Sequence, residues 1–229
     1  YSAHRSSNSH FCPAAKWGEL RSLVHGTTTM QGQPSASGSC INWGIRNANR
    51  YHGLGYDHMG QRIASVRDIN DDDASDLVGH FNDTDEPWTR YHVHMAEGIA
   101  GNVLEEFDSY AGRDTRSNRH AGVSLLDYGT SILIHAIPLT ESQLDEVADT
   151  GSMIVWSPSS NMVLYGQTAP IDAILNRDIL VGLGPDWTPS GEDEMLAEMR
   201  FALDYASDEG ITALDEERLW EMSTMDGAE

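Results

Sequence analysis

Short apolar runs rich in β-branched residues alternate along this chain with longer segments of helical spacing. That alternation predicts βα units and a parallel sheet. The expected strands cover residues 27–30, 43–47, 62–66, 91–95, 132–135, 153–156 and 180–183. The expected helices cover residues 14–24, 98–110, 141–149, 169–176, 193–206 and 216–225. Strands and helices in this order predict an α/β fold, a (β/α)8 TIM barrel that lacks one unit.

The expected helix at 141–149 has recognisable signals at both ends. Thr140 can cap its first turn, and Gln143 stands at the third helical position, which completes a capping box. Gly151 follows its last turn, where glycine is favoured. These signals predict the boundaries of this helix.

The segment 68–86 is rich in aspartate and asparagine. We expect a solvated acidic surface there. A calcium loop is the weaker alternative, because the run of aspartates at 71–73 lacks the spaced ligands and the glycine of an EF-hand.

The charge balance is strongly acidic. Asp and Glu total 36 against 14 Lys and Arg, which gives a net charge of −22, and Lys16 is the one lysine. Such a surface repels itself at low salt, and molar salt shortens the Debye length to about 3 Å and screens it. We therefore expect adaptation to a salty cytoplasm, with an ordinary acidic protein as the alternative. No basic patch is present, so nucleic acid is not an expected partner.

The length and composition suit an ordinary globular domain. The chain has 229 residues, of which 39% are hydrophobic. It contains no run of about 18 apolar residues, so we expect no membrane span. Residues 1–5 contain no apolar signal-peptide core, and a cytoplasmic protein is the expectation. Cys12 and Cys40 form no disulfide framework or metal spacing, and we expect two free, reduced thiols.

Polar residues stand where the expected strands end, which is where barrel enzymes carry their chemistry. His92 and His94 alternate on one strand and share a face, and Glu97 follows three residues later. His135 closes an apolar strand, and Asp186 follows the last one. Each signal alone also fits a structural role. Together they predict a metal centre, because imidazoles and carboxylates bind zinc and a nearby Glu can carry protons.

Several motifs in a fixed order resemble the amidohydrolase superfamily, in the branch of chlorohydrolases and cytosine deaminases. They are HGTTT at 25–29, HMAE at 94–97, IHA at 134–136, LTESQL at 139–144, WSPSSN at 156–161, LYGQT at 164–168 and LGPD at 183–186. The resemblance covers nearly all of the chain. It implies one barrel domain over 1–229 that contains units 2 to 8 of the TIM barrel and is truncated at both ends.

The resemblance implies a role for each matching residue. His94 corresponds to the fifth-strand metal ligand, and His135 to the sixth-strand histidine that contacts metal, water or substrate. Asp186 corresponds to the eighth-strand metal ligand that takes a proton from the attacking water, and Glu97 to the acid that shuttles a proton. His92 matches no family ligand and is expected either to support a metal ligand or to have a structural role. The implied cofactor is one divalent metal, with zinc preferred over iron or manganese.

The implied function is hydrolysis of a C–N bond of a small molecule, by deamination of a ring amine or by amide cleavage. Trp156, Asn161, Tyr165 and Trp187 are candidate substrate contacts, with packing at the barrel rim as the alternative. The chain departs from the family pattern because it has no His-x-His pair near its start. This favours a fragment with a weak metal site and an open edge that associates with another copy. An inactive barrel with a structural or assembly role is the competing hypothesis.

Overall fold

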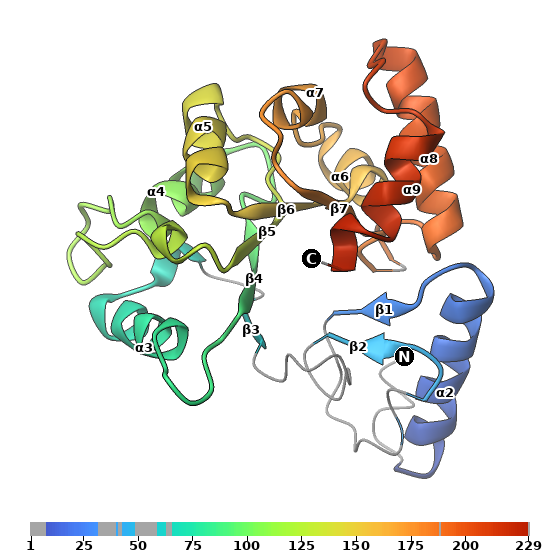
Figure 1. Cartoon of the computed structure of the whole chain (residues 1–229), viewed down its shortest axis with the longest axis horizontal. Helices are drawn as coiled ribbons and strands as arrows, with labels where there is room; N and C mark the ends of the chain where they lie inside the picture. The colour runs from blue at the N-terminus through green and yellow to red at the C-terminus, as the bar shows by residue number, and fades with distance from the viewer. Residues whose placement is uncertain are drawn as a thin grey trace.

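A five-stranded parallel sheet is the main element of the computed structural model, which describes residues 8–31, 40, 43–48, 59–62, 66–187 and 189–228 (Figure 1). Its order follows the chain: β3 (Met59–Arg62), β4 (Arg90–Met95), β5 (Ser131–His135), β6 (Met153–Trp156) and β7 (Val181–Leu183). A separate two-stranded parallel sheet pairs β1 (Thr29–Met30) with β2 (Arg46–Asn47). The predicted α/β class with parallel strands is confirmed.

Helices connect the strands and pack around them (Figure 1). The α-helices are α2 (Asn8–Val24), α3 (Asp71–Phe81), α4 (Glu106–Tyr110), α5 (Glu141–Thr150), α6 (Pro158–Tyr165), α7 (Ile171–Leu175), α8 (Met195–Glu209) and α9 (Glu216–Ser223). The described residues also form the 3-10 helices η1 (Val66–Asp68), η2 (Gly101–Glu105), η3 (Leu125–Tyr128) and η4 (Asp226–Ala228). The described helices include none that is long and apolar enough to cross a membrane.

Alternation along β4 separates the core from the site. Tyr91, Val93 and Met95 are buried in the main apolar cluster, and the ring of Phe81 on α3 meets Tyr91 edge-on at 5.7 Å. The residues between them along the strand face the other side of the sheet, because successive strand side chains point in opposite directions. His94 therefore lies on the face away from α3.

The acidic segment contains a helix, so the expectation of a mere solvated surface at 68–86 was incomplete. Asn70 caps α3 in a capping box with Asp73, and Leu77 and Phe81 bury its inner face. Aspartates in the first turn suit the positive end of a helix dipole. The acidic residues that suggested a loop are therefore the solvated start of α3.

Several helix and strand boundaries differ from those that the sequence predicted. The strand expected at 62–66 is β3 at Met59–Arg62, while Val66 begins η1 and residues 63–65 lie outside the described part. The helix expected at 98–110 is split into η2 and the short α4. The helix α6 was not predicted, and α2 begins six residues earlier than expected, at Asn8 rather than 14. The capping box of Thr140 and the left-handed Gly151 are confirmed.

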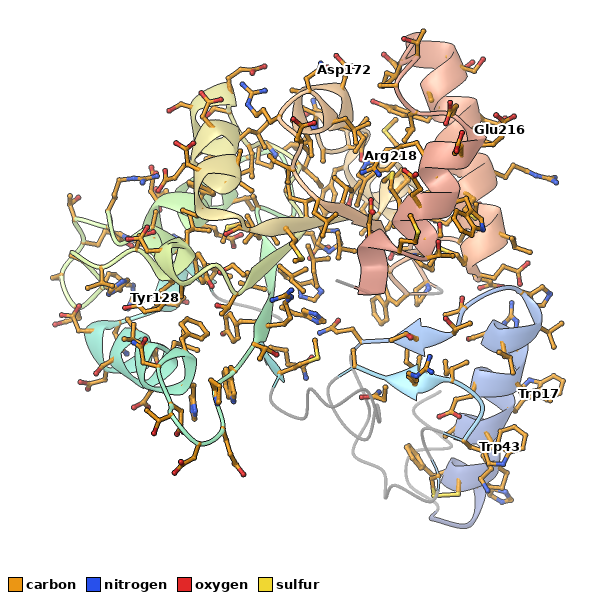
Figure 2. The ribbon with its side chains drawn as sticks, viewed as in Figure 1. Trp17, Trp43, Tyr128, Asp172, Glu216 and Arg218 are labelled. Atoms are coloured by element: carbon orange, nitrogen blue, oxygen red, sulfur yellow. A yellow bond between two sulfur atoms is a disulfide. The ribbon has the colours of Figure 1, made fainter. Side chains whose placement is uncertain are left out.

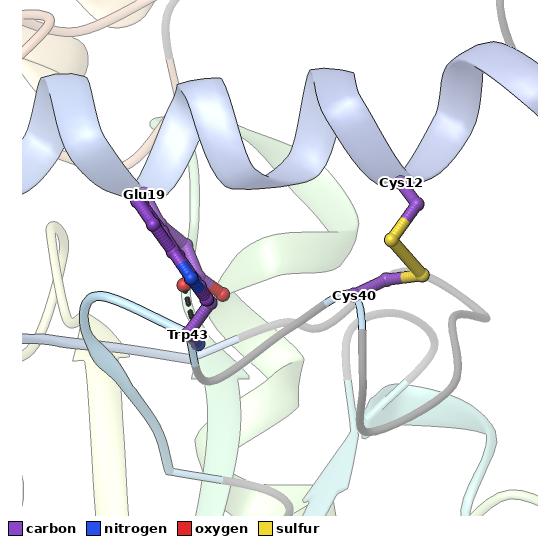
Figure 3. Close-up of a disulfide and its surroundings, with 4 residues drawn as sticks. All are labelled: Cys12, Glu19, Cys40 and Trp43. Atoms are coloured by element: carbon purple, nitrogen blue, oxygen red, sulfur yellow. Dashed lines mark hydrogen bonds between the residues drawn. A yellow bond between two sulfur atoms is a disulfide. The ribbon is translucent and has the colours of Figure 1, made fainter.

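Cys12 and Cys40 form a disulfide, so the prediction of free thiols was wrong. Figure 3 shows the bond between α2 and the segment before β2, with Cα atoms 4.7 Å apart. Nearby, Glu19 of α2 accepts hydrogen bonds of 2.6 Å from the backbone N–H groups of Trp43 and Gly44. The exposed Trp43 lies beside α2 (Figure 2), with Lys16 over its ring. Contacts from distant residues therefore hold Cys40, Trp43 and Gly44 on α2, which the 28-residue spacing of the cysteines did not reveal.

Candidate active site

The ends of three strands in the large sheet adopt an unusual backbone conformation. Ala96 after β4 has a φ of 54°, His135 and Ala136 at the end of β5 have 75° and 52°, and Asp186 after β7 has 61°. Left-handed conformations cost energy for residues other than glycine and cluster at functional sites. The same edge of the sheet therefore contains strained residues beside each predicted catalytic group.

The strained backbone brings His135 and His94 to the same site. In the β4–β5 register His94 stands opposite Ile134, and Met95 stands opposite His135. Regular alternation would therefore place the two histidines on opposite faces of the sheet. The left-handed conformation at His135 ends this regular geometry, and the two imidazole rings lie 5.3 Å apart between their centroids.

One ligand atom each from Glu97, His135 and Asp186 lies within 4.8 Å of the others. His135 is buried, Glu97 is half-buried and Asp186 is exposed, so the group faces solvent on one side. Nε2 of His135 is buried without a hydrogen-bond partner and lies 3.5 Å from Oε2 of Glu97. Two carboxylates and an imidazole are a donor set that binds a divalent metal. His94, predicted as a ligand, lies next to this group rather than within it.

Each member of the group has a partner that fixes it. Nδ1 of His135 lies 3.0 Å from Oδ1 of Asn161. Oδ2 of Asp186 accepts a hydrogen bond of 2.5 Å from the hydroxyl of Ser160. Tyr165 donates a hydrogen bond of 3.0 Å to Oε1 of Glu97. All three partners belong to α6.

Glu106 of α4 forms a hydrogen bond to the backbone of the loop after β4. Its Oε2 accepts a hydrogen bond of 2.7 Å from the backbone N–H of Ala96, the residue before Glu97. Burial raises the pKa of Glu106, while the bond to Ala96 lowers it and the charge of Glu97 raises it. Glu106 thus supports the strained turn that places Glu97.

Two nearby groups have shifted pKa values. Burial, aided by the neighbouring His94 and Arg90, lowers the pKa of His92 to about 4, so this imidazole is neutral at neutral pH. Burial and the charge of Glu97 raise the pKa of Tyr165 to about 12. The Tyr165 phenol therefore keeps its proton and remains a donor throughout the ordinary pH range.

The predicted substrate contacts differ in accessibility. Trp156 and Asn161 are fully buried, and Nε1 of Trp156 donates to Oγ1 of Thr168 at 2.8 Å. Tyr165 is half-buried, and Trp187 is 64% exposed beside Asp186. In this conformation only Tyr165 and Trp187 offer surface to a bound molecule, and substrate contact by any of the four stays a prediction.

Sequence reasoning missed Ser160, Ser190 and Glu106. Ser190 lies 3.2 Å from Oδ2 of Asp186, next to Ser160. The available signal was position: Ser160 precedes Asn161 in the motif that carried the resemblance, and Ser190 follows Asp186 by four residues. Glu106 gave no signal, because a glutamate in a predicted helix is ordinarily solvated.

Known proteins share both sequence and fold with this chain. Residues 80–229 match the model of the amidohydrolase family. The 5-methylthioadenosine/S-adenosylhomocysteine deaminase of Desulfitobacterium hafniense (strain DSM 10664 / DCB-2) is 37% identical over 139 residues, which cover 60% of this chain and 31% of that protein. The chain thus spans about a third of the length of this curated relative.

Two solved structures, both crystallised with zinc, have a similar fold. An adenosine deaminase from Xanthomonas campestris superposes with a TM-score of 0.60 at 17% identity, over 97% of this chain and 57% of that one. An atrazine chlorohydrolase from Arthrobacter aurescens TC1 superposes with a TM-score of 0.61 at 16% identity, over 95% of this chain and 58% of that one. At such low identity these matches support the fold alone.

Proposed function

The chain belongs to the amidohydrolase family, and from this premise we propose that the protein hydrolyses a carbon–nitrogen bond of a small molecule with water activated at one divalent metal. The observation that carries the proposal is the convergence of Glu97, His135 and Asp186 within 4.8 Å at the ends of strands of one parallel sheet. Enzymes built on (β/α) barrels carry their chemistry at the carboxyl ends of the strands, which supports this proposal.

The residues of the site fit a metal. The buried Nε2 of His135 is left without a hydrogen-bond partner, the carboxylate of Asp186 provides a hard oxygen ligand beside it, and the carboxylate of Glu97 lies close enough to carry protons. His94 is the further ligand that we propose, since its ring lies beside that of His135. A bound zinc ion would supply Lewis-acid activation, lowering the pKa of water from about 15.7 to about 7.

The protein groups then divide the proton transfers. Asp186 takes the proton of the attacking water, and Glu97 delivers a proton to the leaving nitrogen. Water adds to the carbon that bears the nitrogen, the C–N bond breaks, and ammonia or an amine leaves with the proton from Glu97. In a ring amine the proton of the remaining hydroxyl moves to the ring nitrogen, so that the oxygen stays as a carbonyl, and the proton held by Asp186 returns to Glu97. The ring of His135 lies within 4.8 Å of both carboxylates, where its Nε2 could contact the metal or the water.

Adenosine-type nucleosides are the substrate class that we propose to test first, because the D. hafniense relative is named for deamination of 5-methylthioadenosine and S-adenosylhomocysteine. The exposed indole of Trp187 beside Asp186 offers a flat apolar surface for a heterocycle. We also propose that the strands belong to a (β/α)8 barrel, with β1–β7 as its units 2 to 8, and that the acidic protein self-associates in concentrated salt.

The test measures ammonia release from 5-methylthioadenosine, S-adenosylhomocysteine and adenosine, together with metal content. We expect about one equivalent of zinc, iron or manganese and turnover that Asp186→Asn and Glu97→Gln each lower by at least 100-fold. Val163→Ala, on the exposed face of α6, is the matched control and should keep full activity. Absence of both metal and turnover would favour the alternative of an inactive structural barrel.

A further inference from the structure

The first turn of α6 reaches two members of the proposed metal group through consecutive residues. Ser160 and Asn161 are both fully buried and lie side by side in sequence. Ser160 bonds to Asp186 after β7, and Asn161 bonds to His135 at the end of β5. One dipeptide therefore connects groups from two strands that are not neighbours in the sheet.

The side chain of Asn161 determines which nitrogen of His135 carries a proton. Its Nδ2 donates to Oγ1 of Thr168 at 3.1 Å, which directs Oδ1 toward Nδ1 of His135. An amide oxygen only accepts, so a hydrogen bond to Oδ1 requires the proton on Nδ1, which in the neutral ring leaves the lone pair on Nε2. That lone pair faces Glu97 and Asp186, as metal or water contact requires.

Ser160 restricts the rotation of the Asp186 carboxylate. Its hydroxyl lies 2.5 Å from Oδ2, and the hydroxyl of Ser190 lies 3.2 Å from the same oxygen and 3.1 Å from Ser160. With Oδ2 held by the two serines, Oδ1 remains for a metal or a water. The backbone of Asp186 is left-handed, so the side chain direction depends on this contact as well as on the strand.

The turn itself is anchored to α8. The backbone N–H of Ser159 donates to Oε1 of the fully buried Glu198 at 3.0 Å. The hydroxyl of Ser159 donates to Oε2 of the same carboxyl. The hydroxyl of Ser159 also accepts from the backbone N–H of Glu192 at 3.0 Å. This anchor fixes the turn without touching His135 or Asp186 through any hydrogen bond in the described residues.

We propose that Ser160 and Asn161 are positioning residues that together pre-organise the metal centre, Asn161 by selecting the Nδ1–H tautomer of His135 and Ser160 by orienting Asp186. The inference rests on the proposed metal-dependent function, but each of the two contacts can be tested separately. Mutation of a residue that hydrogen-bonds to a metal ligand typically lowers the metal affinity 10- to 100-fold.

The tautomer of His135 tests Asn161 in the metal-free protein. We expect two-dimensional ¹H–¹⁵N spectra of histidine-labelled protein, at a pH where the ring is neutral, to show the proton on Nδ1. Asn161→Asp, which keeps an acceptor, should preserve this signature, and Asn161→Leu should move the proton to Nε2. A wild-type ring protonated on Nε2 overturns this half of the proposal, even if Asn161→Leu fails to fold.

Titration with Co²⁺ alone, followed by its visible absorption, tests Ser160. We expect Ser160→Ala to weaken Co²⁺ binding 10- to 100-fold and to change the spectrum. Ser157→Ala is the control, a buried serine of the same turn that makes no capping hydrogen bond.

The outcomes separate the inference from the proposed function. If the wild type and Ser160→Ala bind Co²⁺ with equal affinity, the role of Ser160 is overturned and the metal site is unaffected. Wild-type protein that binds no Co²⁺ overturns the metal centre and the role of Ser160 together, while the tautomer still decides the role of Asn161.

Discussion

Tyr165 on α6 donates a hydrogen bond of 3.0 Å to Oε1 of Glu97 in the loop after β4. The opposite oxygen of that carboxylate lies 3.5 Å from Nε2 of His135. Glu97 is thereby fixed from one side by a phenol that stays protonated, since its pKa is raised to about 12. This contact leaves the oxygen facing His135 available for proton transfer.

Replacing Tyr165 with phenylalanine should therefore impair catalysis more than folding. A hydrogen bond to a charged group contributes about 1.5–3 kcal/mol, so we expect kcat/KM to fall about 10- to 100-fold. Steady-state kinetics and thermal unfolding of Tyr165→Phe would measure both effects. Tyr128→Phe, at a half-buried tyrosine of η3, is the control and should keep its activity. Unchanged kcat/KM in Tyr165→Phe would contradict the proposal that Tyr165 positions Glu97 for proton transfer.

Glu198 should make stability depend on pH. Burial raises its pKa from an ordinary 4.5 to about 7, while the bonds from Ser159 lower it. A carboxyl with a raised folded-state pKa binds its proton more tightly in the folded state, so its stabilising contribution is complete below pH 4.5 and is lost between 4.5 and about 7. The loss amounts to about 3 kcal/mol.

The comparison of Glu198→Gln with the wild type isolates this effect from the other carboxylates. Glutamine resembles the protonated acid, so the free energy of unfolding of the variant relative to the wild type should increase from pH 5 to pH 8. Denaturant unfolding at both pH values measures that difference. Parallel pH profiles of the two proteins would show that the pKa of Glu198 does not change on folding.

Reducing the disulfide should destabilise the region around α2. Cys12 and Cys40 close a loop with a separation of 28 residues, and a loop of that size is worth about 3.6 kcal/mol in the chain-entropy view. We expect the double variant Cys12→Ser/Cys40→Ser, and the wild type in reductant, to unfold at lower temperature. Alkylation and mass spectrometry without reductant should detect no free thiol. Two alkylated cysteines in native protein would contradict the bond.

Salt should stabilise the folded protein. With a net charge of −22, repulsion opposes the compact state, and raising the ionic strength from 0.1 to 1 M shortens the Debye length from about 10 to about 3 Å. We expect the melting temperature to rise with KCl and to level off near molar concentration. Sucrose at matched osmolality is the control for effects other than screening. A flat salt profile would argue against adaptation to a saline environment.

The parallel sheet, and the polar residues Glu97, His135 and Asp186 that lie together at the ends of its strands, could be picked out from sequence, because both depend on local patterns. Apolar periodicity predicted β4 to β7 within a few residues, and the polar residues at their ends indicated where ligands would gather. The capping box of Thr140 was equally local. The helix α3 was missed because aspartates favour both loops and the first turn of a helix.

Other features depended on the tertiary structure. Alternation would separate His94 from His135, and only the left-handed backbone at His135 brings their rings together. The pairing of Cys12 with Cys40 and the contact of Ser160 with Asp186 join residues 28 and 26 positions apart. Sequence thus determined which chemical groups the chain carries and near which strand ends they lie. The fold decided which of them touch, because a hydrogen bond or a disulfide depends on distances of a few ångströms that local periodicity does not specify.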